Sequence, residues 1–478
     1  MPSSPHTHSI DQRHFGKGAP VSSASASLSS TDTSAPRHPR RLVITVLALC
    51  WATVVADGFD VVVFGAVVPS LLRDPSLGLN PASVGVVGSM AVLGMFVGSL
   101  LSGSLTDRFG RKRMLVLSVI WFSVFTGLCA LVPSAEILGL LRFIAGVALG
   151  GVMPAASALT AEYSSPKQRN LVYGVMWSGF PLGGILAALA GLVILPAFGW
   201  RGMFLLGLLP FVLIVPAAVA LLPESAAFLL ARGELAKAKA LAVRHGFVLP
   251  EIGRDSDDVP VRGSVRALFQ GGLARLTVVF WITSFLCLFM IYGLNTWLPQ
   301  IMQAAGYSLG SALGFLLVYN VGAILGLVGI SFLADRFESR PVIITSFLAA
   351  ALSLFLLSIP FPTIALYALL IVAGAAVLGT QAFINAWVSK ESPTEVRGTA
   401  LGWSLGIGRL GSVLAPTALG LLVASGGGTS LNFYAIAVPG ILGAAVLLLF
   451  TTRRGSASGD TVSETKQDTP VTPDGAPT

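Results

Sequence analysis

Two carboxylates lie in the middle of the first long apolar stretch of the chain, in the run ADGFDVVVFG. Asp57 and Asp60 are three residues apart, and this spacing places both side chains on one face of a helix. A charge at the centre of a bilayer costs at least about 2.5–3.5 kcal/mol, so an acidic residue at that depth usually has a function. Two carboxylates so close together resist ionising together, and one of them can carry a proton near neutral pH. The pair predicts a membrane protein that moves a solute with protons.

Two arginines lie inside other apolar stretches, Arg142 in RFIAGVALGG and Arg409 in GWSLGIGRLG. An arginine stays protonated and holds a carboxylate with a planar two-donor fork. At bilayer depth both side chains must face the protein interior or a water-filled cavity. Arg142 could pair with the two acids, for structure alone or for proton coupling, or it could contact an anionic substrate. Arg409 could form the second side of an anion site.

Further polar and aromatic side chains inside the apolar stretches could complete such a site. Amide groups there need hydrogen-bond partners and could bind ring hydroxyls, and aromatic rings could stack on a flat substrate. Each of them could also serve only packing or structure. Besides the two arginines, the candidates for substrate binding are Phe59, Trp177, Tyr292, Asn295, Asn320, Gln381, Asn385 and Trp387. The combination would suit a small aromatic carboxylate.

The composition places the chain in a membrane. Only 11% of its 478 residues are charged, against about 25% in soluble domains, and 54% are hydrophobic. The net charge of +8 does not indicate nucleic acid, because most of the 30 Lys and Arg lie in segments that alternate with nearly charge-free ones. This positive-inside pattern predicts a multi-pass protein of the plasma membrane with both termini in the cytoplasm.

The sequence shows no motif for metal binding, for enzyme catalysis or for an ion channel. Cys50, Cys129 and Cys287 lie in apolar stretches, so we expect packed thiols and neither disulfides, a metal site nor a cofactor. There is no zinc, serine-triad or phosphate-loop pattern, and we therefore expect no enzyme. A channel would need a continuous filter or a ring of charges, which the sequence does not show.

Twelve apolar stretches are each long enough to cross a hydrocarbon core of about 30 Å as a helix. They cover 42–72, 82–105, 114–132, 135–160, 171–195, 202–222, 273–299, 308–333, 341–360, 362–388, 398–425 and 430–451. A polar segment at 223–272 separates the sixth from the seventh and predicts a cytoplasmic loop with one amphipathic helix, at roughly 224–245. The polar ends, 1–40 and 455–478, are expected to be disordered cytoplasmic tails.

The second part of the chain repeats the first. The loop after the second stretch reads GSLTDRFGRKRM and the loop after the eighth reads SFLADRFESRPV, so that Asp335 follows Asp107 by 228 residues. In another pair of loops, AEYSSPKQRN and KESPTEVRG, Pro393 follows Pro166 by 227 residues. Two nearly equal offsets indicate a duplicated unit of six helices.

We therefore predict an all-α integral membrane protein with twelve transmembrane helices in two pseudo-symmetric six-helix bundles, at 41–222 and 273–454. Two such halves around a site at the middle of the membrane are a transporter architecture. Alternating access then arises when one half rocks against the other.

The loop GSLTDRFGRK after the second stretch resembles the loop signature of the major facilitator superfamily, and the resemblance covers about 41–454. Within that superfamily, the run DGFD at 57–60 resembles the D-G-x-D signature of the aromatic acid:proton symporters. Arg142, Arg397 and Arg409 are also similar to features of that family. The resemblance implies the major facilitator fold, a need for both acids in proton-coupled uptake, and a role of Arg142 and Arg409 in binding or coupling.

The same resemblance implies that charged loop residues form a latch. They would hold one access state through contacts with the start of the eleventh stretch, although their charges could also serve only topology. The expected gating residues are Asp107, Arg108, Arg111, Lys112, Asp335, Arg336 and Arg397. The second copy of the loop is degenerate, because Glu338 and Ser339 replace its glycine and arginine, so the two loops are not expected to gate equally.

Residues and resemblance together predict a secondary transporter that imports a small aromatic carboxylate by proton symport. Benzoate, hydroxybenzoate, protocatechuate and gentisate all fit. The expected partners are the aromatic anion, protons and the lipid bilayer, with no nucleic acid, and the protein is expected to act as a monomer. The alternatives are a proton-coupled carrier of another organic anion or a sugar-like solute, an exporter, and, from a different class, a channel or membrane sensor.

Overall fold

The computed structural model describes residues 39–164, 169–245, 249, 265–270, 273–333 and 337–449. Most of the predicted tails, 1–40 and 455–478, lies outside these residues. The α-helices are α1 (Arg40–Leu71), α2 (Pro81–Phe109), α3 (Arg111–Leu128), α4 (Ala135–Tyr163), α5 (Arg169–Trp177), α6 (Gly179–Leu205), α7 (Leu209–Leu221), α8 (Ala226–Ala231), α9 (Leu235–His245), α10 (Leu273–Ala304), α11 (Leu309–Leu333), α12 (Ser339–Leu356), α13 (Thr363–Glu391), α14 (Arg397–Ala424) and α15 (Gly428–Leu449). The 3-10 turns are η1 (Cys129–Leu131), η2 (Leu206–Leu208) and η3 (Val265–Phe269).

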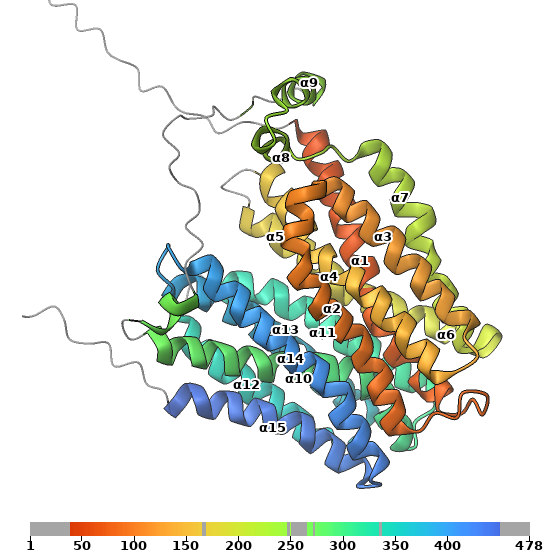
Figure 1. Ribbon diagram of the computed structural model, residues 1–478. Helices are drawn as coiled ribbons and strands as arrows, with labels where there is room; N and C mark the ends of the chain where they lie inside the picture. The colour runs from red at the N-terminus through yellow and green to blue at the C-terminus, as the bar shows by residue number, and fades with distance from the viewer. Residues whose placement is uncertain are drawn as a thin grey trace, which may run out of the picture. The chain divides into compact units, whose positions relative to one another are not determined.

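Eleven helical segments of the described chain are long and apolar enough to cross a membrane. The longest, Leu171–Leu221, contains the predicted stretch 171–195 and all but the last residue of 202–222. Gly199 interrupts it with a φ of 65°, a conformation that glycine adopts without strain, and the chain reverses direction there (Figure 1). Counted as two crossings, this segment brings the number to the twelve that the sequence predicts.

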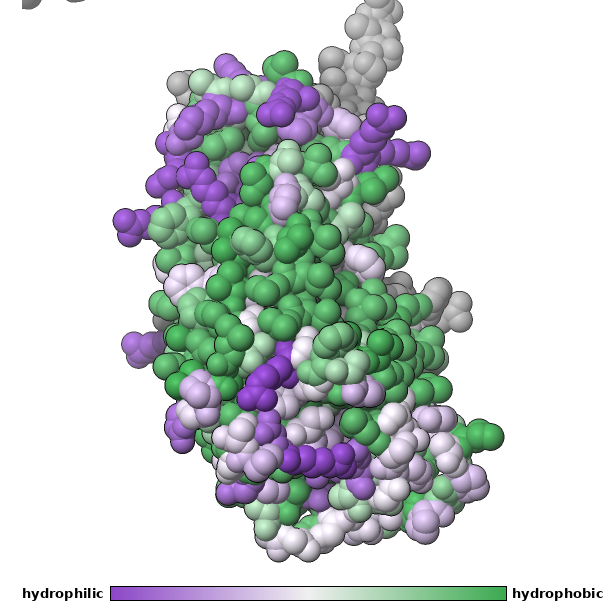
Figure 2. All heavy atoms as spheres, turned by 90° about the vertical axis from the view of Figure 1, so that its right-hand side faces the viewer, coloured by the Kyte–Doolittle hydropathy of each residue, from purple (hydrophilic) through white to green (hydrophobic). Residues whose placement is uncertain are grey.

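The helix ends define two ends of the bundle. Arg40 starts α1, and the basic run 111–113 starts α3, at what we call the basic end. At the opposite end, the far end, α1 ends at Leu71, and α2 begins at Pro81 behind an Asn80 cap. Hydrophobic side chains form a belt between the two ends on the face where α3 and α7 lie, with hydrophilic side chains above and below it (Figure 2). This distribution is that of a protein whose middle faces lipid.

The predicted amphipathic helix at 224–245 is wrong as a single element. The structure has two short helices there, α8 and α9. Between them Gly233 has a φ of 72°, which a continuous α-helix does not allow. Residues 246–248, 250–264 and 271–272 of the predicted loop lie outside the described residues.

The two sets of helices, α1–α7 and α10–α15, meet mainly where α2 packs on α14, α6 on α11, and α1 on α10 (Figure 1). The α2–α14 crossing is very close. A Cβ atom on Gly420 would lie 2.6 Å from the carbonyl oxygen of Pro81 and 3.0 Å from the Cα of Gly85. Ser89 of α2 adds a hydrogen bond of 2.6 Å to the carbonyl oxygen of Val413 of α14.

Among the described residues, the face of α14 that packs on α2 has no packing partner further toward the basic end. Gly402, Gly406, Arg409, Val413 and Gly420 follow one another at intervals that keep them on one helix face. A Cβ atom on Gly402 or Gly406 would meet no other atom within 4 Å. The same face of α14 is therefore closed at the far end and open at the basic end, with Arg409 at the border.

The side of α2 that faces α14 is likewise closely packed at the far end and open at the basic end. Gly85 is in close contact with α14, whereas Gly103, five helical turns further along the same face, has no atom within 4 Å of where a Cβ would be. Two opposed helices thus separate toward the basic end. The space between the two sets of helices opens at that end of the bundle.

Candidate functional site

Asp60 and Arg142 form a buried ion pair. The Nη1 of Arg142 donates to Oδ2 of Asp60 at 2.8 Å, and its Nη2 donates to the backbone oxygen of Asp60 at 3.1 Å. The hydroxyl of Thr126 donates a very short hydrogen bond to Oδ1 of Asp60. Only about 2% of each charged side chain is exposed. Both carboxylate oxygens of Asp60 are therefore occupied by donors from α3 and α4.

Packing holds Arg142 at this depth. The guanidinium carbon lies 5.5 Å from the ring centre of Phe64 and 6.0 Å from that of Phe204, so aromatic faces cover the cation on two sides. The helix that carries Arg142 approaches α2 closely, because a Cβ on Gly146 would lie 2.0 Å from the carbonyl oxygen of Ala91. The pair is fixed by the core of the first set of helices.

Asp57 differs from Asp60 because its side chain has no hydrogen-bond partner among the described residues. It is 1% exposed, and neither of its carboxylate oxygens has a hydrogen-bond partner among the described residues. The neighbouring Gly58 lies so close to α6 that a Cβ would be 2.1 Å from the carbonyl oxygen of Phe180, which fixes α1 in place. A buried ionised carboxylate without a partner is very costly, so this position favours a carboxyl group that holds a proton.

Arg409 and Tyr292 approach Asp57 from the second set of helices. The charge of Arg409 acts on Asp57, and Tyr292 interacts electrostatically with both. The Nη1 of Arg409 is buried and has no hydrogen-bond partner among the described residues. A small cavity with room for about one water molecule lies alongside, lined by Arg142, Tyr292 and Thr296 among others. Asp57, Asp60, Arg142, Tyr292 and Arg409 thus come together from α1, α4, α10 and α14.

Three of the predicted amides donate hydrogen bonds to acceptors within their own helices. The Nδ2 of Asn295 and that of Asn320 each donate to a carbonyl oxygen four residues earlier, at 2.8 and 2.9 Å. Gln381 donates to the side chain of Asn385 at 3.1 Å, one turn further on α13. The oxygens of Asn295 and Gln381 are buried without a partner in the described chain. Asn320 also lies against Gly184 of α6, at the border of the two sets of helices.

The predicted aromatic residues occupy different surroundings. Trp387 is 5% exposed and packs edge-on against Phe280 at 4.7 Å, inside the second set of helices. Trp177 ends α5, 6.0 Å from the ring of Tyr173. Phe59 is half-buried beside the two acids in the chain. Of the four predicted rings, Tyr292 is the one that interacts electrostatically with Asp57 and Arg409, and ligand roles for all four stay predictions.

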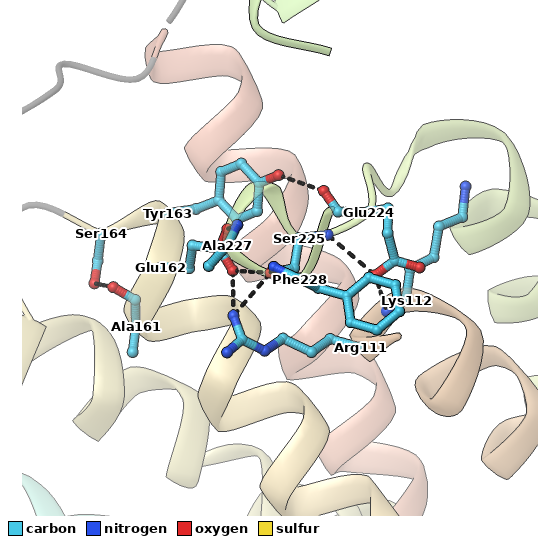
Figure 3. A network of polar contacts seen from close by, with 10 residues as sticks. All are labelled: Arg111, Lys112, Ala161, Glu162, Tyr163, Ser164, Glu224, Ser225, Ala227 and Phe228. Carbon is cyan, nitrogen blue, oxygen red and sulfur yellow. Dashed lines mark hydrogen bonds and ion pairs between the residues drawn. The ribbon is translucent and has the colours of Figure 1, made fainter. Parts of the chain in front are cut away.

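The junction of α2 and α3, where the sequence predicts a loop, takes part in a polar network at the basic end (Figure 3). Arg111 forms an ion pair with Glu162 of α4 and donates to the hydroxyl of Ser225 at 2.8 Å. The carboxylate of Glu224 accepts hydrogen bonds from the backbone nitrogens of Lys112 and Ser225, each at 3.0 Å. The network joins the start of α3 to the end of α4 and to the start of α8.

The predicted latch to the start of α14 stays a prediction. Asp107 and Arg108 are exposed, as is Arg397 at the first residue of α14. Among the ion pairs of the described residues, none joins this loop to α14. Asp335 and Arg336, the predicted gating residues of the second half, lie outside the described residues.

A second polar cluster lies at the far end, in the turn after α1. Asp74 accepts hydrogen bonds from the backbone nitrogen of Ser76 at 2.9 Å and from Nε1 of Trp200 at 2.8 Å, and it pairs with Arg201 at 3.2 Å. These donors hold the pKa of the Asp74 carboxyl well below its usual range. The adjacent Arg73 donates to Gln303 of α10 at 2.8 Å, which links the two sets of helices.

We expect Asp74→Asn to lower the thermal unfolding midpoint of the detergent-solubilised protein equally at pH 7 and pH 5. A lowered pKa stabilises the fold at every pH above the ordinary aspartate value of about 3.9 and loses this effect only as the pH falls toward the folded-state pKa. The difference between variant and wild type should therefore shrink only below about pH 4. A difference that already vanishes between pH 7 and pH 5 would contradict this explanation.

Sequence reasoning missed several residues of these clusters. Thr126 carries no charge and follows no motif, so nothing in the sequence indicates its bond to Asp60. Glu162 and Glu224 do lie in conspicuous polar runs, AEYSSPKQRN and LPES, and a search for acidic partners of Arg111 could have found them. Within the described residues, no group of three or more His, Cys, Asp or Glu is arranged to hold a metal ion.

Comparison with known proteins gives close relatives over most of the chain. The benzoate transport protein of Acinetobacter baylyi is 34% identical over 434 residues, which cover 88% of this chain and 91% of that protein. The gentisate transporter of Corynebacterium glutamicum is 38% identical, with 85% and 87% covered. The 4-hydroxybenzoate transporter PcaK of Pseudomonas aeruginosa is 33% identical, with 84% and 91% covered.

A solved structure supports the fold. The xylose transporter XylE from E. coli, in a partially occluded inward-open conformation, superposes with a TM-score of 0.68 at 17% identity, over 86% of this chain and 99% of that one. The predicted major facilitator fold is thereby confirmed. The model of the Major Facilitator Superfamily matches residues 50–332 and 316–475, and by this match and these relatives the chain belongs to that superfamily.

Proposed function

We propose that this chain is a secondary transporter of the plasma membrane that takes up a small aromatic carboxylate together with protons. The observation that carries the proposal is Asp57, an unpaired carboxyl group buried at the middle of a membrane span beside Arg409 of the other set of helices. Relatives whose names include benzoate, gentisate and 4-hydroxybenzoate support an aromatic carboxylate as the substrate. The protein acts as a monomer in this proposal.

The basic end faces the cytoplasm in this proposal. The lysines and arginines gathered there favour that side by the positive-inside rule, and both termini would then be cytoplasmic. The space that opens beside Gly402 and Gly103 would lead to the cytoplasm, and the closed far end would face outward. The state described would release substrate into the cell.

The two acids have different roles in this proposal. Asp60 stays charged in its pair with Arg142, and Asp57 carries the proton. An anion that enters a cell with a negative interior moves against about 2.3 kcal/mol per 100 mV, and one accompanying proton cancels that charge. Proton coupling therefore makes uptake of an anionic substrate possible.

Uptake of labelled benzoate, 4-hydroxybenzoate and gentisate into proteoliposomes tests the function. We expect accumulation inside vesicles when the outer solution is more acidic, and complete loss of accumulation with an uncoupler. Asp57→Asn should abolish accumulation while the protein still inserts. Flux that is insensitive to the uncoupler would indicate a channel, and net movement only outward would indicate an exporter.

A further inference from the structure

We infer that Asp57 and Arg409 bind the carboxylate of the substrate between them, with the neutral carboxyl group of Asp57 donating to one oxygen and the Arg409 guanidinium to the other. The inference rests on the proposed function and adds how the substrate and the proton are coupled. In this arrangement the proton carrier touches the cargo.

The unpaired atoms at the border of the two sets of helices carry the argument. Both oxygens of Asp57 and the Nη1 of Arg409 are buried without hydrogen-bond partners in the described chain. Buried polar groups are almost always paired, so three such atoms in one place indicate a missing ligand. Although Asp57 and Arg409 interact electrostatically, they are not among the ion pairs of the described residues, so a gap separates them.

The second arginine is not available for this task. Two of the nitrogens of Arg142 already donate to Asp60, and aromatic rings cover its guanidinium. A substrate carboxylate that took over these two donors of Arg142 would have to displace Asp60 and leave that charge buried alone, at high cost. Arg409, by contrast, is partly exposed and lies where the face of α14 opens toward the basic end. The substrate anion can therefore reach Arg409.

The chemistry makes binding depend on the proton. A neutral Asp57 offers one O–H donor, and a carboxylate with two oxygens can accept from that donor and from an arginine together. An ionised Asp57 has no donor and repels the anion. The charged groups that act on Asp57 are Arg409 of α14 and Asp60 of its own helix, the latter balanced by Arg142 of α4, and Tyr292 of α10 is the titratable neighbour. The ring of the substrate would lie toward Tyr292 and Phe64, which line the adjacent cavity.

Equilibrium binding of labelled benzoate to the purified full-length protein, at pH values from 5.5 to 8.5, tests the inference. In the wild type we expect affinity to fall by up to about tenfold per pH unit at the alkaline end, because one proton must bind with each anion. Asp57→Asn keeps a neutral donor in the amide, so its affinity should be nearly independent of pH. Asp74→Asn, the same substitution at the far end, is the matched control and should follow the wild type.

Arg409→Lys provides an independent variant. It keeps the charge but loses the fork, so benzoate affinity should fall by about ten- to a hundredfold at every pH while the pH dependence of the wild type persists. Benzamide, which lacks the negative charge, should not compete with benzoate in any variant.

The outcomes separate the two proposals. If the wild type binds benzoate but Asp57→Asn keeps the wild-type pH dependence, or loses binding at all pH values, the shared carboxylate site is wrong and the proposed function stands. If Arg409→Lys binds benzoate normally, the site is equally wrong. If the wild type binds none of benzoate, 4-hydroxybenzoate and gentisate, the proposed function fails, and this inference fails with it.

Discussion

Asp60→Asn is expected to unfold at a clearly lower temperature than the wild type, whereas Asp57→Asn should be at least as stable as the wild type. Asp60 is one partner of a buried ion pair, and its replacement leaves the charge of Arg142 without a counter-ion. Breaking such a pair from one side costs about 3–5 kcal/mol. Asp57 has no hydrogen-bond partner to lose among the described residues, so its amide variant removes only a poorly accommodated carboxyl group. Thermal unfolding of the purified variants in one detergent gives the comparison.

The double variant Asp60→Asn with Arg142→Gln is the control for this result. Removal of both charges leaves no uncompensated ion, so most of the lost stability should return, although transport should not. Equal unfolding temperatures for Asp60→Asn and Asp57→Asn would contradict the view that Asp60 is held in an ion pair and Asp57 is not. Stability is thus a readout of the Asp60 pair that needs no knowledge of the substrate.

Gly420→Val is expected to abolish uptake and to keep the far end from closing. The first added carbon would lie 2.6 Å from a backbone oxygen of Pro81 and 3.0 Å from the Cα of Gly85, and neither atom is the flexible end of a side chain. The conflict disappears when α14 and α2 move apart at the far end, so the variant should favour the state that is open there. Distances between spin labels at positions 76 and 305, both exposed near the far end, should increase relative to the wild type.

The matched control is the next residue of the same helix. Leu421 is 58% exposed, so Leu421→Ala changes side-chain volume away from the α2–α14 crossing. It should leave both the label distance and uptake unchanged. A Gly420→Val protein with the wild-type label distance and normal uptake would refute the role given to this crossing.

The sequence was sufficient for the fold because its signals are long and repeated. The apolar stretches, the alternation of charged loops and the two copies of a loop motif each extend over many residues, and together they determine the crossings. The boundary predicted between 171–195 and 202–222 falls at Gly199, where a single backbone angle divides an otherwise continuous apolar run. The break of the central helix at Gly233 is of the same kind.

The candidate site was only partly predictable. Depth and spacing single out Asp57, Asp60, Arg142 and Arg409, since each is a charge within an apolar stretch. Which acid pairs with Arg142 depends on how α1 and α4 are aligned along their length, and no local pattern encodes that alignment.

The amides illustrate a different limit of prediction. A buried amide needs partners, and Asn295 and Asn320 find one of theirs in their own helix. A backbone acceptor one turn away is present in every helix, so the residue type alone does not separate a structural amide from one that binds a ligand.

The contacts that close the far end have a consequence for the speed of the transport cycle. They include glycine-mediated helix contact, the hydroxyl contacts of Ser89 with Val413 and Thr417, and the bond from Arg73 to Gln303. A hydrogen bond between neutral groups contributes about 0.5–1.5 kcal/mol, and one from a charged group about 1.5–3 kcal/mol. No ion pair of the described residues spans the two sets of helices. A few weak bonds can be broken by thermal motion at a small activation barrier. The turnover number of this carrier should therefore be limited by the binding and release of the substrate and its proton, rather than by the breaking of strong bonds at the far end.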